Sequence, residues 1–201
     1  ITFINSLDTK NSEILEDIER EALADNVPII RREMQSFLKV LLMVKKPMRV
    51  LEVGTAVGFS ALLMSEYVPE ECAITTIENY EKRIPIARQN FVRAGKEKKI
   101  TLLEGDAMDV LKTLEGPYDF IFMDAAKGQY IHYLPEILRL LAKGGILVSD
   151  NVMQDGDVIE SRFAVERRDR TIHARMREYL YELKHNDALV TSIIPLGDGV
   201  A

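Results

Sequence analysis

The sequence predicts an α/β fold in which a mostly parallel, doubly wound sheet follows a helical N-terminal segment. Three observations favour this class. Short apolar runs recur after residue 47, segments of helical periodicity separate them, and Gly, Pro or charged residues bound each run. Strands that are apolar along their whole length are typical of parallel sheets, because helices cover both faces. The regular alternation of strand and helix also indicates right-handed crossovers within one sheet.

Residues 1–46 are expected to form two helices. The first has charged residues on one face and apolar residues at helical spacing on the other. These apolar residues are Ile14, Leu15, Ile18, Ala22 and Leu23. The sequence Asp-Asn-Val-Pro at 25–28 ends this helix. A second helix is expected over 31–44, with Phe37, Leu38, Leu41 and Leu42 facing inward.

Residues 47–201 are expected to form the α/β core, so that residues 1–201 make a single domain. Strands are expected at 49–53, 74–78, 100–104, 118–124 and 145–150, and helices at 60–67, 81–94, 107–114 and 130–141. A helix at about 171–184 and a strand at 189–195 follow. A Gly-Asp-Gly turn at 197–199 then precedes a last strand, of which we expect the sequence to hold only the start.

Composition limits the classes of function. The net charge of −6 argues against a wholly basic nucleic-acid-binding protein, although it allows a local basic patch. The single cysteine, Cys72, excludes an internal disulfide and suits a reducing cytoplasm, which is the location we expect. The longest apolar stretch, at 37–44, is interrupted by Lys39 and is too short to span a membrane.

Two of the predicted strands end on acidic residues. Asp124 closes the run at 118–124, and Asp150 with Asn151 follows the run at 145–149. Ligands of open α/β sheets bind beyond the carboxyl ends of the strands. If the two strands are neighbours, these residues offer three hard oxygen ligands, which suit Mg²⁺ with positions left open for substrate. The alternative is that each aspartate merely caps the loop that follows it.

A glycine-containing loop joins the first core strand to the next helix, with the sequence LEVGTAVGFS at 51–60. Gly54 and Gly58 allow a sharp turn and a close approach to a ligand. The spacing differs from the G-x-G-x-x-G of dinucleotide-binding dehydrogenases. Glu52 would repel a pyrophosphate but suits a ligand that carries an ammonium group. Glu78 ends the second strand, where an acid typically accepts hydrogen bonds from ribose hydroxyls.

Taken in order, the E-x-G-x-x-x-G loop, Glu78, the G-D-A turn at 105–107, FIFMDAAKGQY and GGILVSDNV resemble S-adenosylmethionine-dependent methyltransferases. More specifically, the chain resembles cation-dependent O-methyltransferases of the catechol and caffeoyl-CoA type, over nearly its whole length. The resemblance implies a Rossmann-like fold for 47–201, S-adenosylmethionine as cofactor and a divalent cation, taken as Mg²⁺. It also implies the site residues. Those for the cofactor are Glu52, Gly54, Thr55, Ser60, Glu78, Asp106, Ala107 and Asp124; those for the metal are Asp124, Asp150 and Asn151; those for catalysis are Lys127 and Asp124.

Such a site predicts an enzyme, a methyltransferase that acts on a hydroxyl oxygen. The cation would chelate two vicinal substrate oxygens, and Lys127 would accept the hydroxyl proton before the oxyanion attacks the sulfonium methyl. The alternative for Lys127 is an exposed lysine before a helix. His132 and His173 are expected to be surface residues. A nicotinamide dehydrogenase is disfavoured by the loop spacing, and a non-catalytic cofactor-binding module by the presence of both metal triad and lysine.

The acceptor is indicated by a segment at 160–177 that is rich in arginine, namely Arg162, Arg167, Arg168, Arg170, Arg175 and Arg177. Arginine suits phosphate contacts; the alternative is a solvated helix with ion pairs. Within the family the chain most resembles bacterial tRNA 5-hydroxyuridine methyltransferases, and Asp155 stands where a caffeoyl-CoA enzyme has an asparagine. The resemblance implies methylation of the wobble uridine, with the tRNA anticodon region as partner. The alternative acceptor is a small catechol-like or caffeoyl-CoA-like phenol. We also expect a homodimer and no membrane partner.

Overall fold

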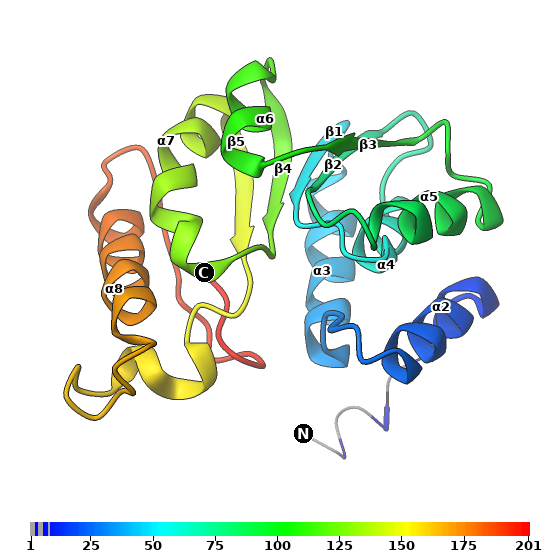
Figure 1. Ribbon diagram of the computed structural model, residues 1–201. Helices are drawn as coiled ribbons and strands as arrows, with labels where there is room; N and C mark the ends of the chain where they lie inside the picture. Colours follow the sequence, from blue (N-terminus) through cyan, green and yellow to red (C-terminus); the bar gives the residue numbers. More distant parts are fainter. Residues whose placement is uncertain (1–2, 4–5, 8) are drawn as a thin grey trace.

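The structure is a computed structural model that describes residues 3, 6, 7 and 9–201. A single parallel sheet lies at its centre, with the strand order β3-β2-β1-β4-β5 (Figure 1). The strands are β1 (Arg49–Val53), β2 (Ala73–Glu78), β3 (Ile100–Glu104), β4 (Tyr118–Met123) and β5 (Leu141–Ser149). All four strand pairs within the sheet are parallel. The predicted α/β class is therefore confirmed.

Helices cover both faces of this sheet (Figure 1). On one face lie α3 (Arg32–Lys45), α4 (Phe59–Glu66) and α5 (Ile84–Arg93), with α2 (Glu13–Ala24) packed against α4; on the other lie α6 (Ala107–Thr113), α7 (Tyr130–Leu140) and α8 (Arg170–His185). Two short 3₁₀ helices, η1 (Lys127–Gln129) and η2 (Gln154–Ile159), precede α7 and follow β5. No helix among the described residues has the length and apolar character needed to cross a bilayer.

Successive residues of the central strands alternate between the two helical layers. Val50 and Phe120 pack in the core beneath α2–α5, whereas Leu51 and Ile121 pack in the core beneath α6–α8. Each such side chain stabilises the fold by about 1.5–3 kcal/mol when fully buried. Because both faces of a strand are buried, β1 and β4 are apolar apart from Arg49, Glu52 and Asp119. The carboxyl ends of these strands are consequently held in fixed positions at one edge of the sheet.

The order in which the chain adds strands to the sheet reverses at β1. The strands β2 and β3 lie on one side of β1, and β4 and β5 lie on the other. The loops that leave the carboxyl ends of β1 and β4 therefore run to opposite faces and leave a crevice between them. The loop after β1 carries the glycines, and the loop after β4 carries Asp124 and Lys127. The topology alone thus brings the two sequence motifs to one edge.

The chain after α8 differs from the prediction. The expected strand at 189–195 is absent, and that prediction was wrong; Ile194 makes only an isolated antiparallel bridge to Val200. Val200 also bridges to Asp150, and Ala201 exchanges backbone hydrogen bonds with Ser149 at 2.8 and 3.0 Å. Leu23, expected to face inward, is exposed on α2.

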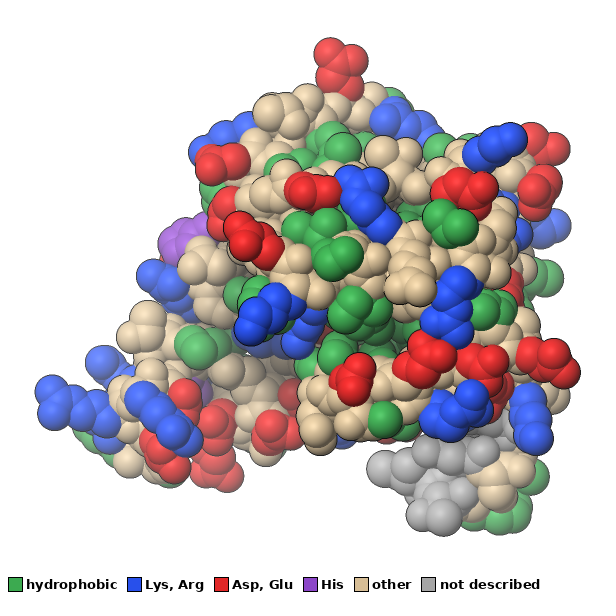
Figure 2. All heavy atoms as spheres, turned by 45° about the vertical axis from the view of Figure 1, so that its right-hand side comes forward, with side chains coloured by type: hydrophobic (Ala, Val, Ile, Leu, Met, Phe, Trp, Pro, Cys, Tyr) green, Lys and Arg blue, Asp and Glu red, His purple; other side chains and the backbone are tan. Residues whose placement is uncertain are grey.

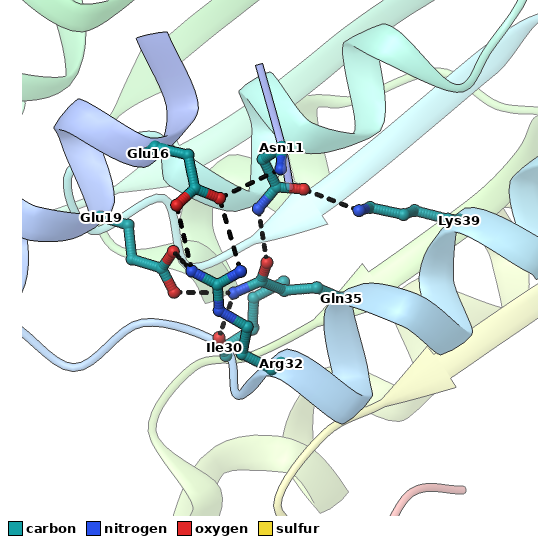
Figure 3. Close-up of polar contacts among 7 residues, drawn as sticks. All are labelled: Asn11, Glu16, Glu19, Ile30, Arg32, Gln35 and Lys39. Atoms are coloured by element: carbon teal, nitrogen blue, oxygen red, sulfur yellow. Dashed lines mark hydrogen bonds and ion pairs between the residues drawn. The ribbon is translucent and has the colours of Figure 1, made fainter. Parts of the chain in front are cut away.

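A buried polar network joins α2 to α3, with the residues Asn11, Glu16, Glu19, Arg32, Gln35 and Lys39 (Figure 3). Gln35 is 2% exposed and donates to Glu19 Oε1 at 3.2 Å and to the carbonyl of Ile30 at 3.1 Å. Its own oxygen accepts from Asn11 at 2.9 Å. Buried polar groups are costly unless they are hydrogen-bonded. The network therefore anchors Ile30 and the start of α3, which border the site.

Candidate functional site

A cavity of about 580 Å³ lies at the carboxyl edge of the sheet. Residues from the loops after all five strands line it, together with residues from 28–34 and the turn at 197–198. This volume falls in the range of about 300–1,000 Å³ that is typical of small-molecule sites. Its position beyond the strand ends, beside the change of direction in the sheet, is where open α/β sheets bind ligands.

The glycine loop after β1 needs both of its glycines. Gly54 has φ +105°, and a Cβ atom there would overlap the backbone carbonyl of Asp124. Gly58 has φ +86° at the start of α4, and a Cβ atom there would lie 2.6 Å from the Phe91 ring. Only glycine adopts such angles without strain, and only a residue without a Cβ atom avoids these overlaps. The loop after β1 therefore lies directly against the loop after β4, which places cofactor and metal candidates side by side.

Glu52 is fully buried at the base of this loop. The Thr76 hydroxyl donates to Glu52 Oε2, whereas Glu52 Oε1 has no hydrogen-bond partner among the described residues. Burial raises the pKa of Glu52 to about 7, although the nearby hydroxyl groups of Ser60 and Thr76 oppose the rise. Glu52 itself does not line the cavity, but Ser60 and Thr55 do. A buried carboxylate oxygen without a partner fits a ligand that supplies an ammonium group.

Glu78 lines the cavity at the end of β2 and ties the glycine loop to that strand. Its carboxylate accepts from the backbone N–H groups of Ala56 at 2.7 Å, Asn79 at 3.0 Å and Tyr80 at 2.9 Å. A carboxylate offers about four lone-pair positions, so that these bonds leave about one for a ligand hydroxyl. Glu78 therefore holds the glycine loop in place as well as lining the cavity.

The residues of the G-D-A turn after β3 have two different roles. Gly105 and Ala107 line the cavity, as expected, but Asp106 does not. The Asp106 carboxylate instead accepts from Met108 N at 2.9 Å and caps α6. An aspartate directly before a helix is a common N-cap. Its position before the helix expected at 107–114 could have indicated this role from the sequence.

The three predicted metal ligands face the same cavity. Asp124 follows β4, and Asp150 with Asn151 follows β5, which is its neighbour in the sheet. Asp150 is 5% exposed; burial first, and then the charge of Asp124, raises its pKa to about 6. Two carboxylates that repel each other at one cavity, with an amide beside them, form an oxygen donor set that fits a hard divalent cation. Among the described residues no cluster of three or more His, Cys, Asp or Glu side chains could hold a metal; the third donor would be the Asn151 amide.

Lys127 lies beside these carboxylates. Its Nζ donates to Asp124 Oδ1 at 2.7 Å and to the Tyr130 hydroxyl at 3.0 Å. The side chain lines the cavity and is 21% exposed. The alternative of an exposed lysine before a helix is therefore wrong. The D-x-x-K spacing produces this contact because Lys127 begins η1, which turns the chain back toward Asp124.

The two histidines differ from each other. His132 is exposed on α7, as predicted, whereas His173 is 3% exposed and its Nε2 lies 3.1 Å from the carbonyl oxygen of Glu160. The prediction for His173 was wrong. It belongs to a stripe of buried residues on α8 that continues with Met176, Tyr179 and Leu183. Their helical spacing was visible in the sequence and could have identified the buried face.

Several cavity residues had no role in the prediction. The segment at 28–34 contributes Ile30, Arg31 and Met34, and the turn after the last bridge contributes Asp198. Asp198 Oδ1 accepts from Asp155 N at 2.5 Å, and Arg31 lies 3.8 Å from Asp155 Oδ1. These contacts join segments that are far apart in the sequence. No local sequence pattern predicts these contacts.

The arginine-rich segment is largely engaged in internal contacts. Arg170, Arg175 and Arg177 donate to the carbonyls of Val165 at 3.2 Å, Gly128 at 3.1 Å and Val158 at 3.3 Å, respectively. Arg168 pairs with Glu166 at 3.0 Å and Asp169 at 3.3 Å. Neither Arg162 nor Arg167 has a hydrogen bond or ion pair with another described residue. Figure 2 shows acidic and basic side chains interspersed over the face that it presents.

Comparison with known proteins agrees with the fold. The family described as O-methyltransferase matches residues 5–201. Caffeoyl-CoA O-methyltransferase 2 of Populus trichocarpa is 33% identical over 181 residues, which are 82% of this chain and 69% of that protein. Catechol O-methyltransferase of Niastella koreensis is 35% identical over 128 residues, 62% of this chain and 58% of that protein. A catechol O-methyltransferase of Mycobacterium tuberculosis is covered over 51% of its length.

Among solved structures, the SAH-bound methyltransferase PaMTH1 of Podospora anserina has a TM-score of 0.89 at 27% identity, covering 99% of this chain and 90% of that one. The cofactor-bound Rv0187 of M. tuberculosis has a TM-score of 0.86 at 26% identity, with 99% and 92% covered. This chain belongs to the O-methyltransferase family, and within it to the catechol and caffeoyl-CoA type. The expected Rossmann-like methyltransferase fold is confirmed.

Proposed function

We propose that this protein transfers the methyl group of S-adenosylmethionine to a hydroxyl oxygen of a small phenol that carries two vicinal oxygens, with Mg²⁺ as the divalent cation. The observation that carries the proposal is the single cavity in which the glycine loop, Glu78, two carboxylates and Lys127 meet. A methyl donor and a chelated acceptor need to share one site, because the transfer is a direct displacement. Relatives named for catechol and caffeoyl-CoA support the choice of acceptor.

The cofactor half of the cavity is formed by the loops after β1, β2 and β3. Glu52 would receive the ammonium group through its unpartnered Oε1, and Ser60 and Thr55 line this part of the cavity. Glu78 would receive a ribose hydroxyl, and Gly105 with Ala107 would face the adenine. Gly54 keeps this half in contact with Asp124. Asp106 caps α6, and the proposal gives it no direct contact with the cofactor.

In the acceptor half, Asp124, Asp150 and the Asn151 amide would hold the cation. When bound, a divalent cation polarises the substrate hydroxyl and fixes the two vicinal oxygens. Lys127 is placed to remove the hydroxyl proton, since its Nζ lies 2.7 Å from Asp124 Oδ1 at the same cavity. Proton removal by a positioned base is typically worth about 10²–10⁴ in rate. Holding both reactants in line contributes about 7–11 kcal/mol at best.

A tRNA substrate is the second candidate. Arg162 and Arg167 are exposed near Phe163, which is 86% exposed. Exposed arginine and aromatic side chains suit phosphates and splayed bases. Four of the six arginines, however, are already bonded to backbone carbonyls or acids. The small phenol is therefore favoured over the 5-hydroxyuridine of the wobble position. We extend the proposal to a homodimer in the cytoplasm; sedimentation of the purified protein tests the dimer, and fractionation of cells tests the location.

The acceptor is tested with labelled S-adenosylmethionine, Mg²⁺ and three acceptors: catechol, caffeoyl-CoA and undermodified tRNA. We expect methylation of a vicinal diphenol, and replacement of Arg162 and Arg167 by alanine should change its rate by less than about twofold, since neither residue lines the cavity. If tRNA is instead the better acceptor, the same double variant should weaken tRNA methylation and flatten its salt dependence by about 0.7 per lost phosphate contact. That result would replace the phenol with RNA. Failure of all three acceptors would contradict the proposed activity.

A further inference from the structure

A single buried hydroxyl connects the candidate base to the strand ends that carry the acidic ligands. Tyr130 is the first residue of α7 and is fully buried. Its Oη lies 3.0 Å from Lys127 Nζ and 3.3 Å from Ala125 N, both of which donate to it. The same atom lies 2.9 Å from the carbonyl of Met123 and 3.2 Å from that of Asp150. The hydroxyl thus contacts the end of β4, the loop after β5 and the lysine.

These contacts use the whole hydrogen-bonding capacity of the hydroxyl. A phenolic hydroxyl has one proton and two lone pairs. Lys127 and Ala125 occupy the lone pairs, and the carbonyls of Met123 and Asp150 share the proton. No capacity is left for a substrate atom, so that Tyr130 does not take part in the reaction directly. Its hydroxyl can only orient the groups that it contacts.

The geometry has a consequence for Lys127. An uncharged amine has two N–H groups and one lone pair. In this site Nζ donates to Asp124 Oδ1 at 2.7 Å and to Tyr130 Oη at 3.0 Å, so that an uncharged Lys127 would direct both of its N–H groups to these two atoms. Because the Tyr130 proton is directed to backbone carbonyls, its oxygen presents only a lone pair to the lysine. The remaining tetrahedral position of Nζ, at a residue that lines the cavity, is then the one available for a substrate proton.

The Tyr130 ring is itself held in place. It packs edge-to-face against Tyr179 of α8, with ring centroids 5.4 Å apart at 73°. The Tyr179 hydroxyl in turn lies 2.6 Å from Ser149 Oγ, next to Asp150. This second hydroxyl belongs to the same buried layer but makes no contact with Lys127. It therefore provides a matched comparison for the loss of one buried hydroxyl.

We propose that Tyr130 is a positioning residue, which aims Lys127 Nζ at the acceptor hydroxyl by joining it to the backbone of Met123 and Asp150. This inference rests on the proposed function, in which Lys127 accepts the proton. It predicts that the hydroxyl of Tyr130 affects the chemical step and not the binding of either substrate. Glu52 and Glu78, the candidate cofactor contacts, have no hydrogen bond to Tyr130 among the described residues.

The kinetic test compares Tyr130→Phe with Tyr179→Phe in the Mg²⁺-loaded enzyme. Tyr130→Phe should lower kcat by about 10- to 100-fold, by analogy with the loss of hydrogen-bond partners that orient metal ligands, with KM for the acceptor and Kd for S-adenosylmethionine changed by less than about threefold. Tyr179→Phe should leave kcat within about twofold. In a Lys127→Met background, Tyr130→Phe should have no further effect on kcat. Equal losses in both tyrosine variants, or multiplicative losses with Lys127→Met, would overturn the inference.

A spectroscopic test does not depend on activity, and its main observation is made on the wild-type protein. In the wild-type protein without ligands, the ¹³Cε signal of Lys127, identified by its loss in Lys127→Arg, should show cross-peaks to the Tyr130 ring, since Nζ lies 5.2 Å from the ring centroid. In Tyr130→Phe this signal should move toward the position of exposed lysines. A wild-type signal without ring contacts would overturn the inference while leaving the proposed function intact. Ring contacts in a protein that methylates no acceptor would contradict the function and leave the geometry standing.

Discussion

Replacement of Asp150 by alanine is expected to abolish methyl transfer in a protein that still folds. Asp150 provides one of two carboxylates at the acceptor half of the cavity, at the end of β5. A bound cation contributes several kcal/mol of charge stabilisation, which corresponds to a loss of about 1,000-fold or more in rate. The rate is measured with labelled S-adenosylmethionine at saturating Mg²⁺, and folding by circular dichroism.

The fold should survive because the Asp150 carboxylate makes one hydrogen bond, to the N–H of its neighbour Asn151 at 2.8 Å, and repels Asp124. Asp109→Asn on α6 is the matched control, since that exposed carboxylate pairs only with Lys112 at 3.6 Å and does not line the cavity. It should retain wild-type activity. Retention of activity in folded Asp150→Ala would contradict the assignment of Asp150 as a ligand.

Replacement of Glu52 by glutamine is expected to weaken cofactor binding and yet to stabilise the ligand-free protein above neutral pH. An ionic hydrogen bond is worth about 1.5–3 kcal/mol, so that Kd for S-adenosylmethionine should rise by about 10- to 150-fold. Calorimetry measures this affinity. In the wild type the affinity should also increase as the pH rises through about 7, the pKa of Glu52, because the charged carboxylate pairs with the ammonium group.

The stability follows from the direction of the same shift. Burial raises the pKa of Glu52 from its ordinary 4.5 to about 7, so that the folded protein holds the proton more tightly than the unfolded chain. The free energy of unfolding must then fall as the pH rises from about 4.5 to about 7, by something on the order of 3 kcal/mol, and stay low above that window. Glutamine removes this loss. Urea unfolding of both proteins at pH 5 and pH 8 measures the difference.

Glu104→Gln serves as the control for Glu52→Gln. Glu104 ends β3, two strands away, and is exposed, with an ion pair to Arg88. Its replacement should change neither cofactor affinity nor the pH dependence of stability by more than a few tenths of a kcal/mol. If Glu52→Gln binds the cofactor as tightly as the wild type, Glu52 is a structural residue. If its stability has the same pH profile as the wild type, the buried carboxylate is not the titrating group.

The strands β1, β3 and β4 were predictable because each is a short, mainly apolar run with clear ends in the sequence. The predicted bounds of β1 and β3 agree with the structure, and those of β4 differ by one residue. The start of β5 was less well predicted: it begins at Leu141 and not at 145. The expected helix ended at 141, and the Leu-Ala-Lys-Gly sequence at 141–144 carries neither an apolar run nor a clear strand period.

The site was predictable where it depends on strand ends and was not where it depends on distant partners. Asp124 and Asp150 follow directly from two strand ends, whereas Lys127 was implied by the resemblance to the family. The contributions of Arg31 and Asp198 depend on the packing of α3 and of the turn at 197–199, which join the cavity through contacts such as Asp198 with Asp155. The arginines at 170–177 donate hydrogen bonds to backbone carbonyls, and no sequence pattern predicts where those carbonyls lie.

The central claim is that one cavity holds a methyl donor beside a cation-chelated acceptor. Its most direct test is the transfer of label from S-adenosylmethionine to catechol by the purified wild-type protein, with Mg²⁺ and with excess chelator. We predict formation of a monomethyl ether with Mg²⁺, loss of the product with chelator, and recovery when Mg²⁺ is restored. Label transfer that continues undiminished in chelator would contradict the account.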